Sequence, residues 1–505
     1  MARKLEKLTL PSIPEIESME LAALVCLAKD WRERIECYQG LLFRAKKKQF
    51  GSSSERSPKN DQQPTPTGDT GVTSDPKTPK PRSDNTKQLS ERYPDAPIQI
   101  EPINFHESPC CPQCGKIMQN SGMTEDSEYL TSSPKEYIIV RQKRQKHRCG
   151  KCHSSIITAP APARIIPGGS YSDEMIIDAT LSKFCDLIPM ERYCQMAARR
   201  GLLGLPPHSL IKASSKLAVF LGGVYDRLKA ETLKTKVLLA DETPHRMLEG
   251  DAKKKWYLWG FSSQTSCFFE CHNTRSGDVS TAVLLDSICE VLVSDVYSGY
   301  SKAIRIANKT RAEKNKSLIV SAYCNAHARR KFKDRDSNDV CEDAEWMIDR
   351  YKDIYKLNTE AKDQDADTVL KKRSEMKPIF EAMKKESLRK INNYSSKSQM
   401  ADAYNYFLEN YEGLTRFLDN HLIPIDNNHS ERILRSHVVG RKTWYGTHSL
   451  RSAETAAVHF SIVESCKMIG VNPHEFYLDA VRRIHSELNP ITPWQYKQQR
   501  ISDTC

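Results

Sequence analysis

Two short apolar segments of the sequence each end on a single aspartate. Asp241 ends "KVLLAD" at 236–241, and Asp295 ends "EVLVSD" at 290–295. Short apolar runs of this kind are typical of buried strands, so each carboxylate is expected at a strand end. Carboxylate oxygens are the ligands that Mg²⁺ prefers, and two such ions can clamp the attacking and leaving oxygens of a phosphodiester displacement. The pair therefore indicates phosphoryl-transfer chemistry, which usually needs a third carboxylate.

Glu431 is the residue that we expect to supply this third carboxylate. It follows the turn and cap residues "DNN" at 426–428, so a helix is expected to begin just before it. Four basic residues of the same segment suit contact with a phosphate backbone: Arg432, Arg435, Arg441 and Lys442. On chemistry alone three other carboxylates remain as alternatives: Asp426, Glu342 and Glu345.

The order of the predicted elements brings the two aspartates together. The strand at 236–241 is followed by two aromatic-rich strands, "KKWYLWGFSS" and "SCFFECH", which are expected to form a hairpin. A helix near 278–289, the strand at 290–295, a helix near 299–309 and the strand "SLIVSAYC" complete the series. This is the order of a ribonuclease-H-like mixed sheet, in which the first and fourth strands are neighbours. We therefore expect an α+β multidomain protein with a catalytic core of this fold.

Two C-x-x-C pairs predict a structural zinc site. "CPQCG" supplies Cys111 and Cys114, and "CGKC" supplies Cys149 and Cys152. Four thiolates suit tetrahedral Zn²⁺, and the 34 residues between the pairs leave room for a β-ribbon. Cys110 is an alternative ligand to Cys111, although only Cys111 has the two-residue spacing. Chance pairing and redox cysteines are the other interpretations.

Basic residues cluster at two further places. The stretch 141–151 carries six Lys/Arg residues, and four of them are predicted to contact DNA phosphates: Arg141, Lys143, Arg144 and Lys146. The alternative for this stretch is a solvated strand face. "CNAHARRKF" adds three residues with the same expectation: His327, Arg329 and Arg330. A position near the metal site and a helix-capping or core role are the other interpretations of the histidine.

Around these motifs the sequence divides into eight segments. Apolar residues at coiled-coil spacing predict a helix over 1–50, which would pair subunits or pack on its own protein. A Ser/Pro/Thr-rich stretch at 51–107 predicts a disordered linker. The remaining segments are a zinc-binding ribbon at 108–160, a helical DNA-binding region at 161–235, the first part of the catalytic core at 236–330, a helical insertion at 331–425, the glutamate helix and following helices of the core at 426–485, and a C-terminal tail at 486–505.

Composition excludes several classes of protein. The 505 residues carry a formal net charge of +12, which favours a polyanionic partner such as nucleic acid. No apolar run of about 18 residues predicts a membrane span, and the N-terminal segment does not have the pattern of a secretory signal. Sixteen cysteines, four of them in C-x-x-C pairs, fit a metal site in a reducing compartment. We therefore expect a cytoplasmic protein.

Six motifs in order resemble the transposases of the insertion sequence 66 family. They are "KKKQFGSSSERS", the "CPQCG…CGKC" pair, "LLADET", "VSDVYSGY", "CNAHARRKF" and "DNNHSERILRSHVVGRKTWYGTHS". The resemblance implies a ribonuclease-H-like core with a DDE triad of Asp241, Asp295 and Glu431, interrupted by a helical insertion before the glutamate. The chain departs from the family at Asn325, where the family usually has Trp, and at Thr443, where it commonly has Asn.

The resemblance also implies an activity. It predicts a DNA transposase that binds the terminal inverted repeats of an insertion sequence and catalyses strand cleavage and strand transfer into target DNA, with Mg²⁺ or Mn²⁺ at the catalytic site and structural Zn²⁺. Expected partners are double-stranded DNA, further copies of the chain and accessory proteins of the same element, in the bacterial nucleoid. The alternative is a zinc-dependent DNA-binding protein with an inactive transposase-derived core; a cellular nuclease of the same fold would not need the N-terminal modules.

Overall fold

The computed structural model describes residues 89–92, 98, 117, 135–148, 156–248, 255–333, 342–362, 364–396 and 398–504. The chain forms two compact units, Met1–Pro134 and Lys135–Cys505. The described part of the first unit holds one short helix, α3 (Leu89–Arg92), within the segment predicted as a linker. The predicted helix at 1–50, most of that linker and the cysteines predicted to bind zinc lie outside the described residues.

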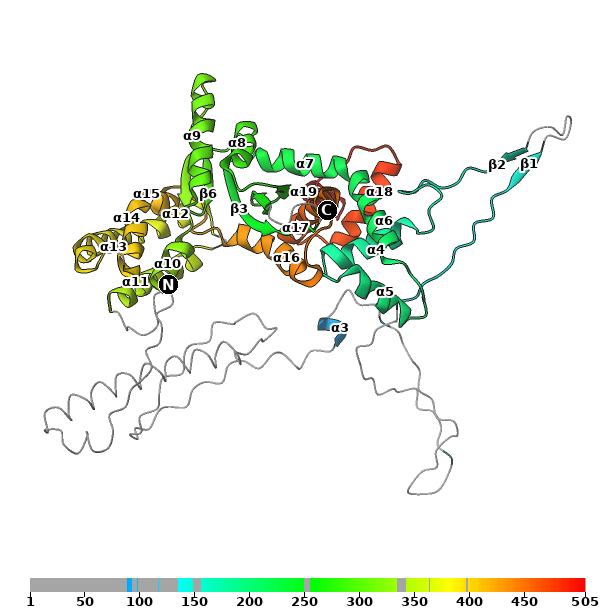
Figure 1. The fold of residues 1–505 in the computed structure, drawn as a ribbon, viewed down its shortest axis with the longest axis horizontal. Helices are drawn as coiled ribbons and strands as arrows, with labels where there is room; N and C mark the ends of the chain where they lie inside the picture. Colours follow the sequence, from blue (N-terminus) through cyan, green and yellow to red (C-terminus); the bar gives the residue numbers. More distant parts are fainter. Residues whose placement is uncertain are drawn as a thin grey trace, which may run out of the picture. The chain divides into compact units, whose positions relative to one another are not determined.

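The second unit is built around a five-stranded mixed sheet (Figure 1). Its strands lie in the order β5 (Cys267–His272), β4 (Trp256–Ser262), β3 (Val237–His245), β6 (Val291–Ser294) and β7 (Val320–Tyr323). β3, β4 and β5 pair in antiparallel fashion, whereas β6 runs parallel to both β3 and β7. The predicted hairpin and the predicted contact between the first and fourth strands are confirmed.

The first strand is longer than the sequence predicted. β3 continues four residues past Asp241 to His245, because the partner β4 keeps pairing with it as far as Trp256. Pairing with β6 covers only Val237 to Leu239. Asp241 therefore does not end its strand. It lies just beyond the point where β6 stops, so one side of β3 is open there.

Both faces of the sheet are buried. One face packs against α7 (Gly222–Leu233), α8 (Gly277–Asp286) and α9 (Ser298–Glu313) through Trp259 and Phe261. Under β4 and β5 the other face packs against α16 (Asn428–Trp444) and α17 (Leu450–Met468) through Leu258 and Phe269. In Figure 1 α8 and α9 lie above the sheet and α16 below it. Burial on both faces explains the continuous apolar runs at 237–240 in β3 and 291–293 in β6.

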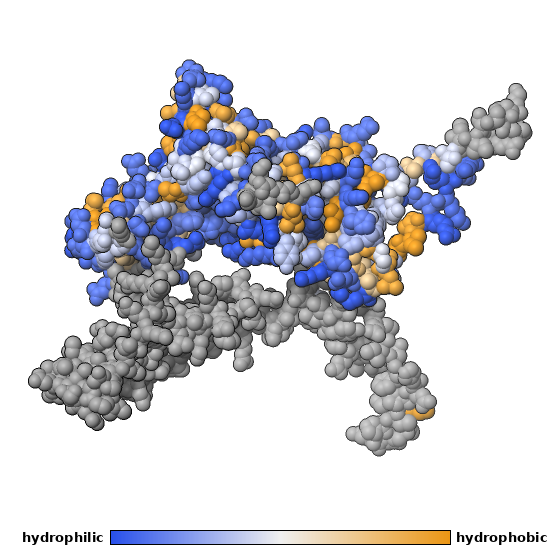
Figure 2. All heavy atoms as spheres, in the orientation of Figure 1, coloured by the Kyte–Doolittle hydropathy of each residue, from blue (hydrophilic) through white to orange (hydrophobic). Residues whose placement is uncertain are grey.

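The segment between β7 and α16 is helical, as predicted. It contains α10 (Asn325–Lys333), α11 (Glu342–Glu360), α12 (Ala366–Ser374), α13 (Lys377–Lys390), a 3₁₀ turn at Ile391–Asn393, α14 (Gln399–Glu409), α15 (Tyr411–Thr415) and a 3₁₀ turn at Arg416–Asp419. Its core, which includes Tyr351, Phe380 and Phe407, is continuous with the face of β3 and β6 that Leu239 and Val293 present. Its outer surface is largely hydrophilic (Figure 2).

Helices on either side of the sheet region share a further core. α4 (Asp173–Phe184), α5 (Met190–Ala198) and α6 (Pro207–Phe220) precede the sheet, and α18 (Pro473–His485) and α19 (Pro493–Thr504) follow α17. Ile177 and Leu217 from the first group pack with Ile462 of α17 and Phe476 of α18. A two-stranded ribbon, β1 (Lys146–Arg148) with β2 (Ile156–Thr158), lies N-terminal to these helices in the sequence. None of the helices in the described residues is long and apolar enough to cross a membrane.

Asn325 holds the two ends of the helical insertion together. Its buried side-chain amide donates hydrogen bonds to Leu414 O (2.8 Å) and Ile425 O (3.0 Å). Its backbone N–H also donates to Ile425 O, at 3.2 Å. The chain therefore leaves the sheet after β7 and returns beside the same point, immediately before α16. Leu414 follows Gly413, whose backbone packs so closely on the Tyr323 ring that an added Cβ would lie 2.3 Å from it.

We predict that Asn325→Ala lowers the free energy of unfolding by about 1–3 kcal/mol, because it leaves a buried carbonyl without its donor. Urea denaturation of the full chain measures this loss. The control is Asn392→Ala, at an exposed position of a 3₁₀ turn, with an expected effect within about 0.5 kcal/mol. Equal unfolding midpoints for the two variants would contradict this role for Asn325.

Candidate functional site

The three predicted catalytic carboxylates lie at one edge of the sheet. Asp241 is on β3, Asp295 directly follows β6, and Glu431 is in the first turn of α16. Burial, followed by the nearby charges of Glu242, Asp295 and Glu431, raises the pKa of Asp241 to about 8. The other three carboxyl groups are therefore close enough to Asp241 for their charges to change its pKa.

Two cavities open beside these carboxylates. Asp241 and Glu431 line a cavity of about 260 Å³, whereas Asp295 lines a second of about 530 Å³. His327 and Arg330 form part of the wall of both. The carboxylates therefore face space that a ligand can enter, and a guanidinium group stands beside it.

Asn427 fixes the start of the glutamate helix against the sheet. Its buried side-chain amide donates to Ala240 O at 3.0 Å, and its backbone N–H donates to Cys324 Sγ at 3.2 Å. Ala240 immediately precedes Asp241. Asn427 is the N-cap residue of α16, in agreement with its expected place in the turn and cap segment, but its side chain makes no capping hydrogen bond and instead joins the helix to β3.

A pair of buried histidines makes a second connection between β3 and α16. His245 Nδ1 lies 3.1 Å from His437 Nε2, and His245 Nε2 lies 2.6 Å from Thr447 Oγ1. Burial lowers the pKa of both imidazoles, that of His245 to about 4. Both rings are therefore neutral near pH 7, which lets one accept the hydrogen bond that the other donates. Together with Asn427, the pair sets the position of Glu431 along the strand.

Glu242 is a site residue that the sequence analysis missed. Its side chain is 2% exposed and accepts hydrogen bonds from Tyr300 Oη (2.5 Å) and Arg275 Nε (2.7 Å). The Arg275 guanidinium lies 4.1 Å from the centre of the Tyr297 ring, and the Tyr297 backbone N–H donates to Asp295 Oδ1 at 3.2 Å. This network connects the strand of one aspartate to the loop of the other. The feature of the sequence that could have identified Glu242 is its place directly after Asp241 in "ADE".

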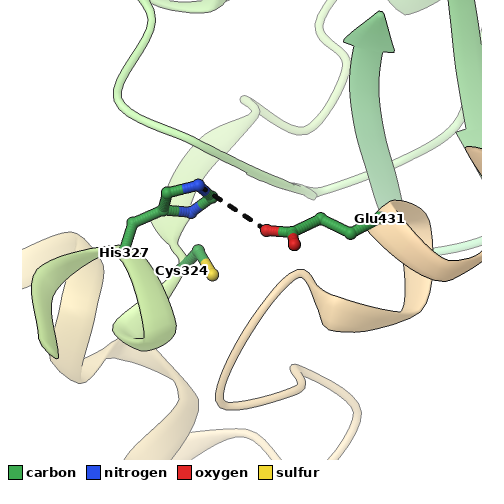
Figure 3. Close-up of side chains that lie close together, drawn as sticks. All are labelled: Cys324, His327 and Glu431. Carbon is green, nitrogen blue, oxygen red and sulfur yellow. Dashed lines mark ion pairs between the residues drawn. The ribbon is translucent and has the colours of Figure 1, made fainter. Parts of the chain in front are cut away.

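Cys324 is the second residue that was missed (Figure 3). It follows β7 and is fully buried, and His327 comes three residues later in the first turn of α10. One ligand atom each from Cys324, His327 and Glu431 lies within 4.8 Å of the other two. His327 Nε2 is 3.6 Å from Glu431 Oε1, and burial raises the pKa of the Cys324 thiol to about 11. The signal for this cluster was the C-x-x-H spacing, which suits metal ligation.

The predicted basic residues are divided between the site and the surface. Arg330 lines both cavities, and Arg329 packs over the Tyr355 ring at 5.8 Å. The others lie outside both cavity walls. Most of them are exposed: Arg141, Lys143, Arg144, Lys146, Arg432, Arg435 and Lys442. Arg441 is half-buried, and burial lowers its pKa. Lys331 and Arg275 add positive charge to the larger cavity without having been predicted.

Comparisons with known proteins find relatives that are similar to most of this chain. Three relatives come from Sinorhizobium fredii (strain NBRC 101917 / NGR234), each described as an uncharacterized protein. Protein y4jD is 28% identical over 438 residues, which cover 83% of each chain. Protein y4hP is 24% identical over 438 residues, covering 82% of this chain and 78% of the relative. Protein y4qI is 27% identical over 523 residues, covering 95% and 93%.

The family itself is identified by a match to a family model. The model of the family described as "Transposase IS66 family" matches residues 168–455, more than half of the chain. This range begins before α4 and extends into α17, so it includes the whole five-stranded sheet, the helical insertion and the helix of Glu431. The chain therefore belongs to the insertion sequence 66 family of transposases, proteins of mobile elements.

Proposed function

We propose that this protein is a DDE-type DNA transposase with a ribonuclease-H-like catalytic core. The observation that carries the proposal is that Asp241, Asp295 and Glu431, which lie up to 190 residues apart, meet at one edge of a sheet whose strand order is β5-β4-β3-β6-β7. The reaction would be hydrolysis of a phosphodiester at each transposon end, followed by attack of the freed 3′-hydroxyl on target DNA, with no covalent protein–DNA intermediate.

The donor set fits hard divalent cations. Asp241 and Glu431 share one cavity, and Glu431 Oε1 is buried without a hydrogen-bond partner among the described residues. Asp241, Asp295 and Glu431 would hold Mg²⁺ or Mn²⁺, which when bound activates the attacking group and stabilises the leaving oxygen. Burial raises the pKa of Glu242, the hydrogen bonds from Tyr300 and Arg275 oppose that rise, and both residues would hold the carboxyl group in place beside Asp241.

The same proposal assigns DNA contacts to the basic residues. Arg330 and Lys331 would contact the phosphates nearest the carboxylates, because both line the larger cavity with Asp295. The exposed residues of 141–146 and of α16 would bind DNA further from the reacting phosphate. Two parts of the proposal concern residues outside the described part of the chain. Cys111, Cys114, Cys149 and Cys152 would bind Zn²⁺, and an N-terminal helix would pair subunits. Accessory proteins of the same element would assist the reaction.

An inactive DNA-binding relic is the second function that we weigh. It would need no convergence of carboxylates, whereas Asp241, Asp295 and Glu431 are all present and the charges of the last two act on Asp241. The nucleoid would be the place of action in either case, because both functions require DNA. The carboxylates therefore favour the enzyme.

Substitution of single carboxylates tests the catalytic proposal. We expect Asp241→Asn, Asp295→Asn and Glu431→Gln each to reduce strand cleavage of a marked mini-element at least about 100-fold, because loss of a residue that merely orients a metal ligand already costs about 10–100-fold. Binding of each variant to transposon-end DNA is measured in parallel and should be retained. Asp286→Asn, at the exposed end of α8, is the matched control with unchanged cleavage.

Two results would contradict this assignment. If the wild-type chain binds the ends but never cleaves them, the DNA-binding relic is the better account. If only Glu431→Gln stays active, the third carboxylate has to be sought at Asp426, Glu342 or Glu345.

The affinity for the divalent cation should depend on pH. The raised pKa of Asp241, about 8, means that its carboxyl group is largely neutral below that pH, and cation binding must displace the proton. We expect the apparent Mg²⁺ affinity to rise about tenfold per pH unit between pH ~6 and pH ~8 and to level off above. Isothermal titration calorimetry in buffers of different ionisation enthalpy measures both the affinity and the released proton.

Asp241→Asn serves as the control for this titration. It should bind Mg²⁺ more weakly and lose most of the pH dependence over the same range. A wild-type affinity that does not change with pH would show that Asp241 is not the carboxyl group displaced by the cation.

A further inference from the structure

A set of soft ligands lies beside the proposed Mg²⁺ site. The Cys324 sulfur is fully buried and accepts a hydrogen bond from the Asn427 backbone N–H. His327 Nδ1 and Glu431 Oε1 are both buried atoms without a hydrogen-bond partner among the described residues. Figure 3 shows the imidazole of α10 and the carboxylate of α16 turned toward one another above the thiol. Nothing in the proposed DDE reaction requires a thiol at this place.

The spacing of these ligand atoms suits one small cation. They lie within 4.8 Å of one another. Ligands about 2.0–2.3 Å from a tetrahedral ion are roughly 3.3–3.6 Å apart, so side-chain rotations that move the atoms by about 1 Å would complete the coordination. Cys324 and His327 come from one strand–helix junction, whose backbone already fixes both. A fourth position would remain open for solvent or another ligand.

The chemical types of these three ligands determine which cation the site would prefer. Thiolate and imidazole ligands favour Zn²⁺ and similar transition metals, whereas Mg²⁺ prefers oxygen ligands and keeps its water. An ion can reach the cluster, because the side chains of His327 and Glu431 are 29% and 31% exposed and line the same cavity. Binding would release the thiol proton to solvent as the sulfur–metal bond forms.

We infer that Cys324, His327 and Glu431 form a second metal site, specific for Zn²⁺-like cations, that shares Glu431 with the Mg²⁺ site. The regulatory consequence rests on the proposed function, in which Glu431 is the third catalytic carboxylate. A Zn²⁺ ion held by Cys324 and His327 draws Glu431 away from Asp241 and Asp295. Zn²⁺ is therefore an inhibitor of Mg²⁺-dependent cleavage that acts through the thiol.

Cobalt binding tests the site without any measurement of activity. The full-length protein is first freed of metal, then given one equivalent of Zn²⁺, which the predicted four-cysteine site should bind in preference to the Cys324 site, and then titrated with Co²⁺. The measured signal is the absorption band that Co²⁺ shows only when thiolate ligands bind it. We expect one equivalent of this band in the wild type, its loss in Cys324→Ser, and at least about tenfold weaker binding in His327→Gln. Cys271→Ser, which removes a partly exposed thiol of β5, is the matched control and keeps the band.

Two further variants separate this site from the Mg²⁺ site. Asp241→Asn should keep the cobalt band, because Asp241 belongs only to the Mg²⁺ site, whereas Glu431→Gln should weaken it. Absence of the band in the folded wild type, or a band that persists in both Cys324→Ser and His327→Gln, would overturn the inference. The contact between His327 and Glu431 would then serve only to orient the carboxylate. Thermal unfolding of each variant confirms that it is folded.

Zinc inhibition tests the consequence. Cleavage in excess Mg²⁺ is measured against rising Zn²⁺, with each variant compared with its own zinc-free rate. Cys324→Ser should need at least about tenfold more Zn²⁺ for half-inhibition than the wild type or Cys271→Ser. A cobalt band in a protein that never cleaves DNA would support the metal site while contradicting the proposed function. Normal cleavage with no band would overturn the metal site alone.

Discussion

Four carboxyl groups at one partly buried edge of a sheet repel one another, and much of the surrounding structure offsets that repulsion. The raised pKa of Asp241 is the direct sign of it, since burial and three neighbouring acids all disfavour its charged form. Glu242 is stabilised separately by Arg275 and Tyr300, and Arg330 brings a positive charge to both cavities. A bound divalent cation would offset the remaining repulsion between the carboxylates. Without a cation such a cluster destabilises the fold, which is why it suits cation binding better than a purely structural role.

Holding the cluster together requires rigid connections, because each carboxylate comes from a different element. The parallel pairing of β3 with β6 sets the two aspartates beside each other. The glutamate arrives after a long insertion, and its position depends on Asn427 and on the paired imidazoles of His245 and His437. These contacts are buried and mostly uncharged, so they hold α16 against β3 without adding to the negative charge of the site.

The departures from the family pattern have structural roles in this chain. Asn325, where the family usually has Trp, is fully buried and joins the two ends of the insertion through its amide. Thr443, where the family commonly has Asn, donates to Gly440 O within α16 at 2.7 Å. Neither residue touches a carboxylate of the site. Both are therefore compatible with the proposed activity, because they serve the framework that positions Glu431.

The sequence by itself determined where most strands of the sheet and the glutamate helix lie, and it identified three of the four carboxyl groups at the site. Short apolar runs, an aromatic hairpin and the "DNN" turn predict β3, β4, β5, β6 and the start of α16, because local patterns of apolar and turn residues reflect burial and backbone geometry directly. The order of these elements then predicted that β3 and β6 are neighbours. The same local patterns misjudged the end of β3, since the extra length depends on the partner strand β4.

Only the tertiary structure decided which side chains share the site. Glu242, Cys324 and Asn427 acquire their roles from partners 58, 107 and 187 positions away in the sequence, namely Tyr300, Glu431 and Ala240. No local periodicity encodes such pairs, because they depend on how the insertion closes and how α16 packs on the sheet. The chemistry of single residues could thus be predicted from the sequence, whereas the meeting of a thiol, an imidazole and the carboxylate of Glu431 is a property of the fold.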